Sequence, residues 1–443
     1  MKRIAFVMAV MCAACSGGTG PRGEAGPTGA RGDKGDSGAA GAPGTDAGVR
    51  LLDARTGLWL TANRARINDF IRATGRGGAG WKGEARPVAT FDWDNTVLKN
   101  DMGDATFFYM LKNDKVLQPS GKDWSVTSTH LTAAARTALN AACDAGAAAG
   151  APLPTSTSTA CADELFSIYD AGATKVGAAA WDKTVTKLNN TGYAWAAQLL
   201  EGYSPEEARS FARAAYWSNF FAPRGATQTV GTTTGLSAHV EIYEEMTDLI
   251  GALQDSGFDV WITTASPQYV IDAIAPLTGV EPDHVLGIRN QVDAAGKLTA
   301  RLVGCGTVAD GLDTLITFDE GKRCWINKAI FREPPAAQMP RNPDPARRPV
   351  FSAGDSDTDI AFVKDATVLK LAINRNKAQL MCNAYANAGN KWLIQPMFLS
   401  PKGKKSSPFA CTTATDADGV RITDENGAAF TRDYEDTVYA LEQ

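Results

Sequence analysis

The sequence predicts an α/β fold built on a parallel sheet. Three short apolar runs, at 87–91, 258–263 and 350–353, have the length and the flanking turn residues of buried strands. Stretches with apolar residues near helical spacing accompany them, at 51–75 and 241–255. Short apolar strands that alternate with helices are typical of α/β proteins, and this alternation is the main ground for the prediction.

The remaining segments of the globular part also have recognisable patterns. Residues 101–250 are mostly helical in pattern, whereas 136–161 is dominated by Ala, Gly, Ser and Thr and predicts a loop. The sequence Ser-Pro-Glu-Glu at 204–207 predicts a helix start, with an N-cap serine, an early proline and a capping-box glutamate. A helix is expected at 322–331 and a proline-rich loop at 334–349.

Composition and missing motifs argue against several classes of function. The 443 residues carry 44 Lys and Arg against 49 Asp and Glu, so the net charge is 44 − 49 = −5. This balance offers no basic excess for binding nucleic acid, and no such partner is expected. The three histidines are scattered, and the motifs of zinc proteases, zinc ribbons, P-loops and nucleophile elbows are absent from the sequence.

Residues 1–14 predict an export signal. A basic start is followed by an apolar run at 4–11 that is too short to span a bilayer as a stable helix. The small residues before Cys15 resemble the lipobox of bacterial lipoproteins, in which that cysteine is acylated. The resemblance implies an exported lipoprotein that faces the periplasm or the cell exterior and touches the membrane through its lipid anchor only. Cys12 is the poorer candidate because bulky Met11 precedes it, and a plain secretory signal is the alternative.

Residues 15–48 contain a strict glycine repeat. Ten glycines occupy every third position from Gly17 to Gly44. Only glycine fits the crowded axis of a collagen triple helix, so the repeat resembles bacterial collagen-like stalks. Because ten triplets with three prolines would be marginal as a triple helix, two interpretations stay open: a solvated, flexible tether and a stalk that joins three chains.

Six cysteines remain once Cys12 leaves with the signal and Cys15 is lipidated. An even number in an exported chain predicts disulfides, although six cysteines allow 15 pairings. Buried free thiols are the alternative for some of them. Sequence proximity favours the pairs that close short loops, namely Cys143–Cys161, Cys305–Cys324 and Cys382–Cys411.

Carboxylates gather at the expected ends of two strands. Asp92 and Asp94 follow the first apolar run, Asp355 and Asp359 follow the third, and hydroxyl residues that include Thr264 end the second. Ligand sites in open α/β sheets lie at the carboxyl ends of the strands, so these side chains are expected to converge. Like charges brought together need a compensating cation, and hard oxygen ligands indicate Mg²⁺.

This pattern resembles the haloacid dehalogenase (HAD) superfamily of phosphatases. The segment Phe-Asp-Trp-Asp-Asn-Thr at 91–96 matches the family's DxDx[T/V] motif, and Thr264 matches the hydroxyl that ends its second motif. Lys322 matches the third motif, and Gly-Asp-Ser-Asp-Thr-Asp at 354–359 matches the fourth, GDxxxD. All four occur in the family's order, over roughly residues 50–400. By this resemblance, Thr264 and Lys322 would hold phosphate oxygens.

The resemblance also implies roles for the aspartates. Asp92 would attack phosphorus and form an aspartyl phosphate, while Asp94 would protonate the leaving alcohol and then activate water. Mg²⁺ would be held by the carboxylates of Asp92 and Asp355 and by the backbone carbonyl of Asp94. Asp359 would bind metal-bound water or orient Lys322. Dehalogenases of the family lack the second aspartate, so Asp94 argues against dehalogenation.

Further landmarks are similar to the branch of phosphoserine and phosphorylcholine phosphatases. The segments 283–288 and 296–299, followed by Lys322, have that branch's layout, which favours Lys322 over Lys328 as the third-motif lysine. The first motif together with nearby Asp101 resembles the phosphorylcholine phosphatases more than the phosphoserine phosphatases. Asp101 is therefore a candidate substrate-selecting residue. The expected substrate is a small phosphomonoester, with phosphocholine as one candidate.

The gap from Asp92 to Thr264 (264 − 92 = 172 residues) is too long for a strand–helix–strand crossover alone. By the resemblance, a Rossmann-like core at 49–100 and 251–443 carries an inserted, mainly helical cap at 101–250. Six aromatic residues of the cap could enclose a quaternary ammonium group by cation–π contact, or could form the cap's own core. They are Trp124, Tyr169, Trp181, Trp195, Tyr216 and Trp217.

Two other functions stay open at this point. One is a phosphotransferase of the same family, which would pass the aspartyl phosphate to an alcohol instead of water. The other is a catalytically inactive surface protein whose collagen-like segment makes its interactions. The intact set of Asp92, Asp94, Lys322 and Asp355 argues against the inactive protein.

Overall fold

The computed structural model describes residues 49–83, 85–144, 146–182 and 188–441. The expected export signal at 1–14, Cys15 and the glycine repeat at 15–48 therefore lie outside the described residues. Within the described part of the chain, none of the helices has both the length and the apolar character needed to cross a membrane.

A six-stranded parallel sheet forms the centre of the fold, which confirms the predicted α/β class. Its strands are β1 (Val88–Phe91), β6 (Asp259–Pro267), β7 (Val285–Ile288), β10 (Phe351–Gly354), β11 (Leu369–Asn374) and β12 (Trp392–Pro396). They pair in the order β12-β11-β10-β1-β6-β7, and each pairing is parallel. Phe91 of β1 lies level with Ala353 and Ile262, so the residues that follow these three positions meet at one edge of the sheet.

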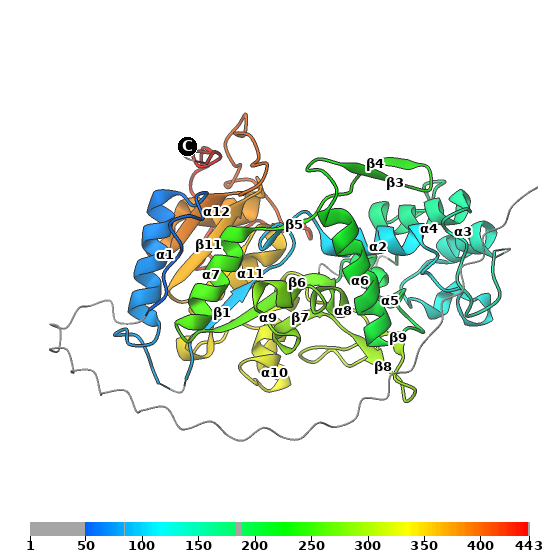
Figure 1. Ribbon diagram of the computed structural model, residues 1–443, viewed down its shortest axis with the longest axis horizontal. Coiled ribbons are helices and arrows are strands. Elements are labelled where there is room, and N and C mark those ends of the chain that lie inside the picture. The colour runs from blue at the N-terminus through cyan, green and yellow to red at the C-terminus, as the bar shows by residue number, and fades with distance from the viewer. Residues whose placement is uncertain (1–48, 84, 145, 183–187, 442–443) are drawn as a thin grey trace, which may run out of the picture. The chain divides into compact units, whose positions relative to one another are not determined.

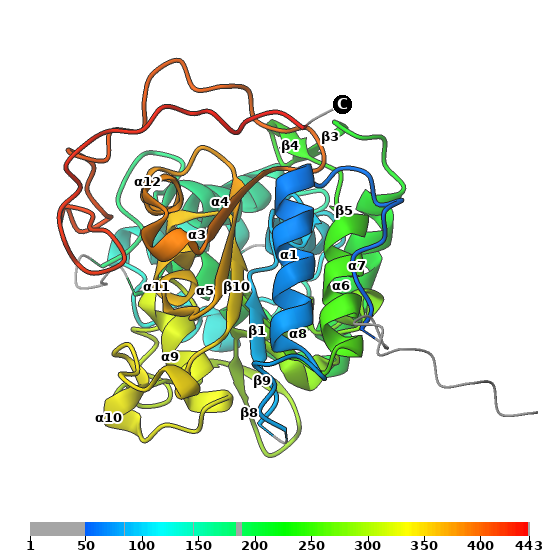
Figure 2. The ribbon, with the colours of Figure 1, turned by 90° about the vertical axis from the view of Figure 1, so that its left-hand side faces the viewer.

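Helices cover both faces of this sheet (Figures 1 and 2). The covering helices are α1 (Thr61–Thr74), α7 (Glu244–Asp255), α9 (Glu320–Ala329), α11 (Ile360–Asp365) and α12 (Ala378–Ala386). α1 and α7 bury Ile67 and Leu249 in the core on one face, while α9 and α11 bury Trp325 and Phe362 in the core on the other. Burial on both faces explains why β1, β10 and β11 have no exposed residue.

A second hydrophobic core lies in the helical region that follows β1. Its helices are α2 (Met102–Lys112), α3 (Ala133–Cys143), α4 (Thr159–Ala171), α5 (Thr191–Gln198) and α6 (Pro205–Phe220). Phe107, Trp124, Leu165 and Trp195 belong to this core. The short antiparallel pair β2 (Leu98–Lys99) and β5 (Glu241–Ile242) marks where the chain leaves the sheet region and returns to it.

Residues 101–250 are mostly helical, as expected, but two details differ from the sequence expectation. Residues 101–250 also contain an antiparallel hairpin, β3 (Thr227–Val230) and β4 (Thr233–Ser237). Its strands are mostly exposed, so they lack the apolar alternation that reveals a strand in a sequence. The loop expected at 136–161 is shorter, because α3 continues to Cys143 and α4 begins at Thr159. Small residues favour a loop by composition, but alanine is also the best helix former.

Other boundaries also differ from the sequence expectation. The helix expected at 51–75 begins only at Thr61, and the loop expected at 334–349 contains the short helix α10 (Pro335–Gln338). The strands β7, β11 and β12 are absent from the prediction. In β11 the apolar run is interrupted by Lys370, which is fully buried and forms an ion pair with Glu425 (2.5 Å).

The predicted disulfides and the predicted helix start are confirmed. All three favoured pairs, Cys143–Cys161, Cys305–Cys324 and Cys382–Cys411, are formed. α6 begins with the expected capping box, in which Ser204 and Glu207 each bond to the other's backbone N–H. Short-range patterns of this kind are predictable because both partners lie close together in the sequence.

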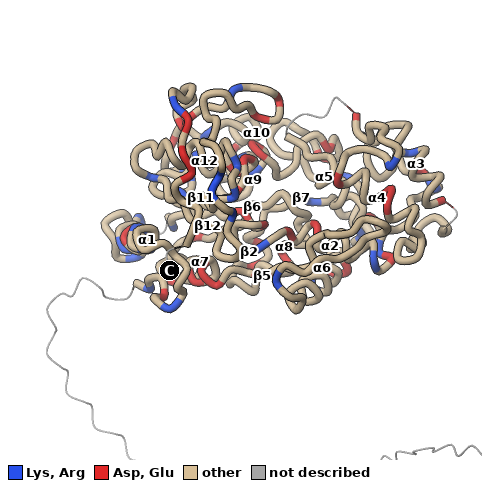
Figure 3. The backbone as a smooth tube through the Cα atoms, turned by 90° about the horizontal axis from the view of Figure 1, so that it is seen from above, with Lys and Arg blue, Asp and Glu red and all other residues tan. Residues whose placement is uncertain are grey.

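The remaining elements are short. They are α8 (Gln268–Ile271), β8 (Asn290–Val292) and β9 (Leu298–Leu302), together with the 3₁₀ turns Ser120–Lys122, Trp124–Val126, Ala275–Thr278, Pro282–His284, Pro345–Arg347, Asp357–Asp359 and Ala388–Asn390. Acidic and basic residues are interspersed along the described chain (Figure 3). The described residues after β12 form no helix, and a disulfide from Cys411 ties them to α12.

Candidate active site

The predicted site residues come together at the carboxyl ends of β1, β6 and β10. Asp92 directly follows β1, and its backbone N–H donates to the carbonyl of Ala353 at the end of β10 (2.9 Å). Asp355 directly follows β10, and Thr264 lies near the end of β6. Parallel register therefore gathers side chains that lie hundreds of positions apart in the sequence.

Lys322 joins two of the predicted aspartates. Its Nζ donates to Oδ1 of Asp92 and to Oδ1 of Asp359, both at 2.6 Å, and its side chain is 2% exposed. Burial alone would lower the pKa of Lys322, but the two carboxylates raise it above the usual lysine value, so the amine stays charged. Lys328 instead donates to the carbonyl of Gly304 (2.7 Å), which leaves Lys322 as the lysine of this site.

A second cation, Arg375, contacts Asp355. Its Nη1 donates to Oδ2 of Asp355 at 2.6 Å, and the Thr96 hydroxyl lies 3.1 Å from Oδ1 of Asp355 and 3.0 Å from Oδ2 of Asp92. Burial raises the pKa of Asp355 and nearby Asp359 raises it further, while Arg375 opposes both. The sequence analysis missed Arg375. A signal existed, because Arg375 directly follows β11 at the same edge of the sheet.

The carboxylates of the site suit a hard divalent cation. One oxygen each from Asp92, Asp355 and Asp359 lies within 4.8 Å of the others, and all three residues are buried. Lys322 and Arg375 supply two positive charges against these three negative ones. The excess negative charge and the all-oxygen donor set fit Mg²⁺.

Asp359 is already engaged by the protein. Its Oδ2 accepts from the backbone N–H groups of Asp355 (3.0 Å) and Ser356 (2.9 Å), while its Oδ1 accepts from Lys322. Gly354 permits this turn, since a Cβ there would lie 2.6 Å from the Cβ of Asp359. Of the two roles expected for Asp359, its contacts fit orientation of Lys322. Asp92 and Asp355 each accept fewer hydrogen bonds than Asp359 and are the better candidate ligands.

Asp94 lies opposite this cluster and has different partners. Its Oδ1 accepts from the backbone N–H of Met102 (2.7 Å), and its Oδ2 accepts from the Ser266 hydroxyl (2.7 Å) and, at 3.4 Å, from the Thr264 hydroxyl. Burial raises the pKa of Asp94 well above the usual aspartate value, and the nearby charge of Asp101 raises it further. Burial raises the pKa values of both Asp92 and Asp94, but Lys322 donates to Asp92, whereas Asp94 has no cation among its hydrogen-bond partners. Asp94 is therefore the better candidate to carry a proton.

Thr264 lies next to the site but is not among the residues that line its cavity. The residue is fully buried, and its hydroxyl also accepts the backbone N–H of Ser266 (3.1 Å). Ala265 and Ser266 line the cavity instead. Ser266 is thus a second residue that the sequence analysis missed, and its position two residues after Thr264 on an extended strand explains why both can reach Asp94.

A cavity of about 200 Å³ separates Asp92 from the helical region. Both the sheet and the helical region contribute to its walls. The lining residues are Asp92, Asp94, Asn95, Asp101, Asn190, Tyr193, Ala265, Ser266, Phe318, Lys322, Asp355, Ser356, Thr358, Arg375 and Lys377. Asn190 caps the N-terminus of α5 and Tyr193 lies in its first turn, so this helix covers the opening above the aspartates.

Buried acids and tyrosines extend the cavity beyond Asp94. Asp101 caps α2 by accepting the backbone N–H of Asp104 (2.9 Å), and the Tyr169 hydroxyl donates to Asp104 (2.5 Å). Burial, and then the charge of Asp104, raise the pKa of Asp101 to about 7. Burial raises the pKa of Asp104 to about 6, although the Tyr169 hydrogen bond opposes the shift. Asp101, Tyr169 and Tyr193 together line a narrow extension of the cavity.

The six candidate aromatic residues divide between these environments. Trp124 and Trp195 are fully buried in the helical core, where Trp181 also packs. Tyr216 is buried beside β5, while Trp217 is 43% exposed on the outer face of α6. Among the six, Tyr169 is the one that lines the active-site extension, and the sequence analysis missed its neighbour Tyr193.

Comparisons with known proteins give a fold match and no sequence family. No family model matches the chain, and no curated protein matches it in sequence. A conserved protein of unknown function from Anaerococcus prevotii is 20% identical in sequence, with 78% of this chain and 93% of that chain covered and a TM-score of 0.56. At that identity the likeness extends to the fold alone.

Other solved structures match more weakly. A protein of unknown function from Bordetella pertussis is 15% identical, with 70% of this chain and 99% of that chain covered and a TM-score of 0.39. A substrate-bound phosphoserine phosphatase is 12% identical, with 65% of this chain and 86% of that chain covered and a TM-score of 0.28. Neither similarity is close enough to carry an argument about the site.

Proposed function

We propose that this chain is a Mg²⁺-dependent phosphomonoesterase of the HAD superfamily. One observation carries the proposal: Asp92 stands at the end of β1 with Lys322 on one oxygen, Asp355 beside it, and Asp94 on the same cavity. Hydrolysis through an aspartyl phosphate needs a carboxylate nucleophile, a fixed cation and a second carboxyl group that carries a proton. The order of the four motifs in the sequence supports the same assignment.

In the first half-reaction, an oxygen of Asp92 forms a bond to phosphorus while the bond from phosphorus to the ester oxygen breaks. The ester oxygen takes the proton of the Asp94 carboxyl group and leaves as an alcohol. In the second half-reaction, Asp94 removes a proton from water as the water oxygen attacks phosphorus. The bond from phosphorus to Asp92 breaks, which releases inorganic phosphate and restores both carboxyl groups.

The remaining groups balance charge around the phosphoryl oxygens. Bound Mg²⁺ would supply positive charge there, with Asp92, Asp355 and the Asp94 carbonyl as its protein ligands. Lys322 holds Asp92 in place and stays protonated throughout. Arg375 lines the same cavity and is the group best placed to take a phosphoryl oxygen from the side of β11.

We propose a small phosphomonoester with a cationic alcohol as substrate, and phosphocholine is the candidate. Asp101, Tyr169 and Tyr193 support this choice, because they border the extension of the cavity beside Asp94, where the leaving alcohol would lie. A carboxylate and two aromatic rings are the groups that recognise an ammonium ion. The extension is narrow, with a volume of about 10 Å³, so the proposal requires α5 to shift outward when such a substrate binds.

We also propose that the protein is exported and attached to a membrane through a lipid on Cys15. Three disulfides support an oxidising compartment. The glycine repeat at 15–48 would hold the enzyme away from the membrane, as a flexible tether or as a stalk of three chains. Mass spectrometry of the mature protein would detect the lipid on Cys15, and sedimentation of the full chain would separate monomer from trimer.

The function is tested with a screen of small phosphomonoesters that includes phosphocholine and phosphoserine, at acidic and neutral pH with Mg²⁺. The D92N variant should lose hydrolysis by several orders of magnitude, and chelation of Mg²⁺ should abolish it reversibly. The matched control is D69N, since Asp69 is an exposed aspartate whose partner is Arg72 on the surface of α1. Undiminished Mg²⁺-dependent hydrolysis by D92N would defeat the assignment of the nucleophile. Phosphate transferred to an added alcohol, with none released as inorganic phosphate, would indicate a phosphotransferase.

A further inference from the structure

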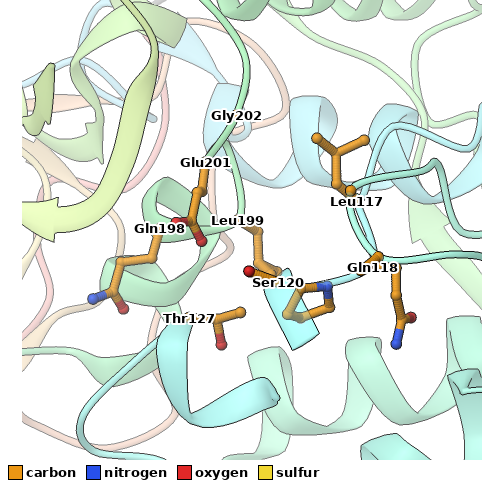
Figure 4. A pocket seen from close by; sticks show the side chains of 11 residues that line it. Leu117, Gln118, Ser120, Thr127, Gln198, Leu199, Glu201 and Gly202 are labelled. Carbon is orange, nitrogen blue, oxygen red and sulfur yellow. The ribbon is translucent and has the colours of Figure 1, made fainter. Parts of the chain in front are cut away.

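A second cavity lies within the helical region, away from the aspartates. Its volume of about 290 Å³ lies near the lower end of the range for small-molecule sites, roughly 300 to 1,000 Å³. Three segments form most of its wall: residues 117–120 after α2, the loop residues 149–150, and residues 198–202 at the end of α5. Figure 4 shows Gln198 and Glu201 on one side of this cavity and Leu117 and Gln118 on the other.

This cavity is separate from the active site but shares a helix with it. The two cavities have no lining residue in common. α5 connects them, because Tyr193 near its start lines the active site and Gln198 at its end lines the second cavity. A ligand bound at the end of α5 would therefore contact the element that covers the aspartates.

The wall of the second cavity combines apolar side chains with one carboxylate and several uncharged polar groups. Leu117, Pro119 and Leu199 provide apolar surface, and Glu201 is the one charged residue among those that line it. Within the described chain, the Glu201 side chain has no hydrogen bond or ion pair. Burial raises the pKa of Glu201 and the charge of Arg301 opposes the shift, so the carboxylate is partly desolvated and has no direct partner among the described residues.

Three of the uncharged polar side chains of the wall already donate hydrogen bonds within the protein. The amide nitrogen of Gln118 donates to Asp144 (3.3 Å), and that of Gln198 donates to the carbonyl of Ala300 (2.8 Å). The Thr127 hydroxyl donates to the carbonyl of Trp124 (2.8 Å). The C-terminal end of α5 adds partial negative charge. A ligand that complements this wall must bring its own donors and a positive charge.

The cavity is held open by fixed contacts. The backbone N–H of Gly150 donates to the carbonyl of Gln118 (2.8 Å), and that of Gly202 donates to the carbonyl of Leu298 (2.9 Å). The disulfide Cys143–Cys161 closes the loop that carries residues 149–150. Because these segments are already fixed, little conformational entropy is lost when a ligand binds in the cavity, which favours affinity.

We infer that this cavity is a binding site for a small organic cation, an amine with a short apolar body. The ammonium group forms an ion pair with Glu201, and the apolar body packs against Leu117, Pro119 and Leu199. The inference does not depend on the proposed phosphatase activity, because none of these residues lies in the catalytic cavity.

Benzylamine is a suitable probe, with benzyl alcohol as its neutral match, and calorimetric titration of the full chain is the measurement. Wild-type protein should bind benzylamine, and E201Q should bind it at least about tenfold more weakly, since a charge-assisted hydrogen bond is lost. The A149W variant should also lose binding, because Ala149 lies exposed on the wall and a large ring there occludes the cavity. E206Q is the control, since Glu206 is an exposed glutamate on α6 outside the cavity.

Thermal unfolding checks that each variant folds. E201Q should be no less stable than wild type, because the charge that it removes has no direct partner in the part of the chain that the structure describes. Three results would each overturn the inference: no binding of benzylamine by wild type, equal affinity in wild type and E201Q, or equal affinity for benzyl alcohol. Loss of binding in D101N, with E201Q unaffected, would place the amine in the catalytic cavity and overturn it as well.

Discussion

Replacement of Lys322 by methionine should destabilise the fold through a mechanism that can be followed with pH. The ammonium group of Lys322 forms ion pairs with Asp92 and Asp359, and its Nζ lies 2.6 Å from an oxygen of each. The three side chains are between 0% and 7% exposed. Removal of one partner from a buried ion pair costs about 3 to 5 kcal/mol, because a buried charge is left without compensation. K322M should therefore lose about 3 to 5 kcal/mol of unfolding free energy at pH 7.5, measured by urea unfolding, together with phosphatase activity.

The pH dependence gives this prediction its sign. The pKa of Asp92 is already raised by burial and by Asp359, and without Lys322 it should rise further. A carboxyl group whose pKa is raised in the folded state stabilises the fold below its unfolded pKa and loses that contribution as pH rises through the folded value. The deficit of K322M should therefore be largest at alkaline pH and should shrink as pH falls and Asp92 becomes protonated.

Lys328 provides the matched control for this experiment. It lies on the same helix as Lys322, and its Nζ has the carbonyl of Gly304 as its hydrogen-bond partner. K328M should cost about 1 kcal/mol, the usual loss for one hydrogen bond, with no loss of activity. A K322M variant that is as stable as K328M across pH 5 to 9 would refute the placement of Lys322 between two buried carboxyl groups.

Three other perturbations test separate parts of the structure. D94N should lower kcat by about 10² to 10⁴, because a general acid is lost. Inorganic phosphate should still bind, because the charged groups around Asp92 remain; steady-state kinetics and calorimetry measure the two effects. D101N should flatten the pH dependence of unfolding between pH 4 and 7: the pKa of Asp101 is raised to about 7, so its contribution is present below pH 4 and is lost as pH rises toward 7. Loss of the Cys382–Cys411 disulfide, with both cysteines changed to serine, should cost roughly 3 to 4 kcal/mol in urea unfolding for a loop of 29 residues, whereas an unchanged midpoint would contradict it.

Several features of this protein were predictable from short stretches of sequence. Strands β1, β6 and β10 were predictable because their side chains are buried on both faces and the runs are nearly all apolar. The capping box at Ser204 and the three disulfides depend on partners no more than 29 positions apart. The aspartates at strand ends were predictable as a group, because parallel strands of one sheet end at a common edge.

Other features depended on contacts between distant segments. Lys322 and Asp92 are 230 positions apart, and only the packing of α9 against β6 and β7 distinguishes Lys322 from Lys328 by geometry. Arg375 gains its partner because β11 pairs with β10, and Tyr193 reaches the active site because α5 folds back over the sheet edge.

The sequence by itself determined the α/β class, the strand-end carboxylates and the covalent cross-links. The tertiary structure alone decided which cations face those carboxylates, which way the Thr264 hydroxyl turns, and that a separate cavity contains the side chain of Glu201. The physical reason is how far apart the interacting residues lie in the sequence. Periodicity, caps and short loops act between neighbours in the chain, whereas charge compensation and cavity walls are made by side chains that only the packing of distant elements brings within a few ångströms.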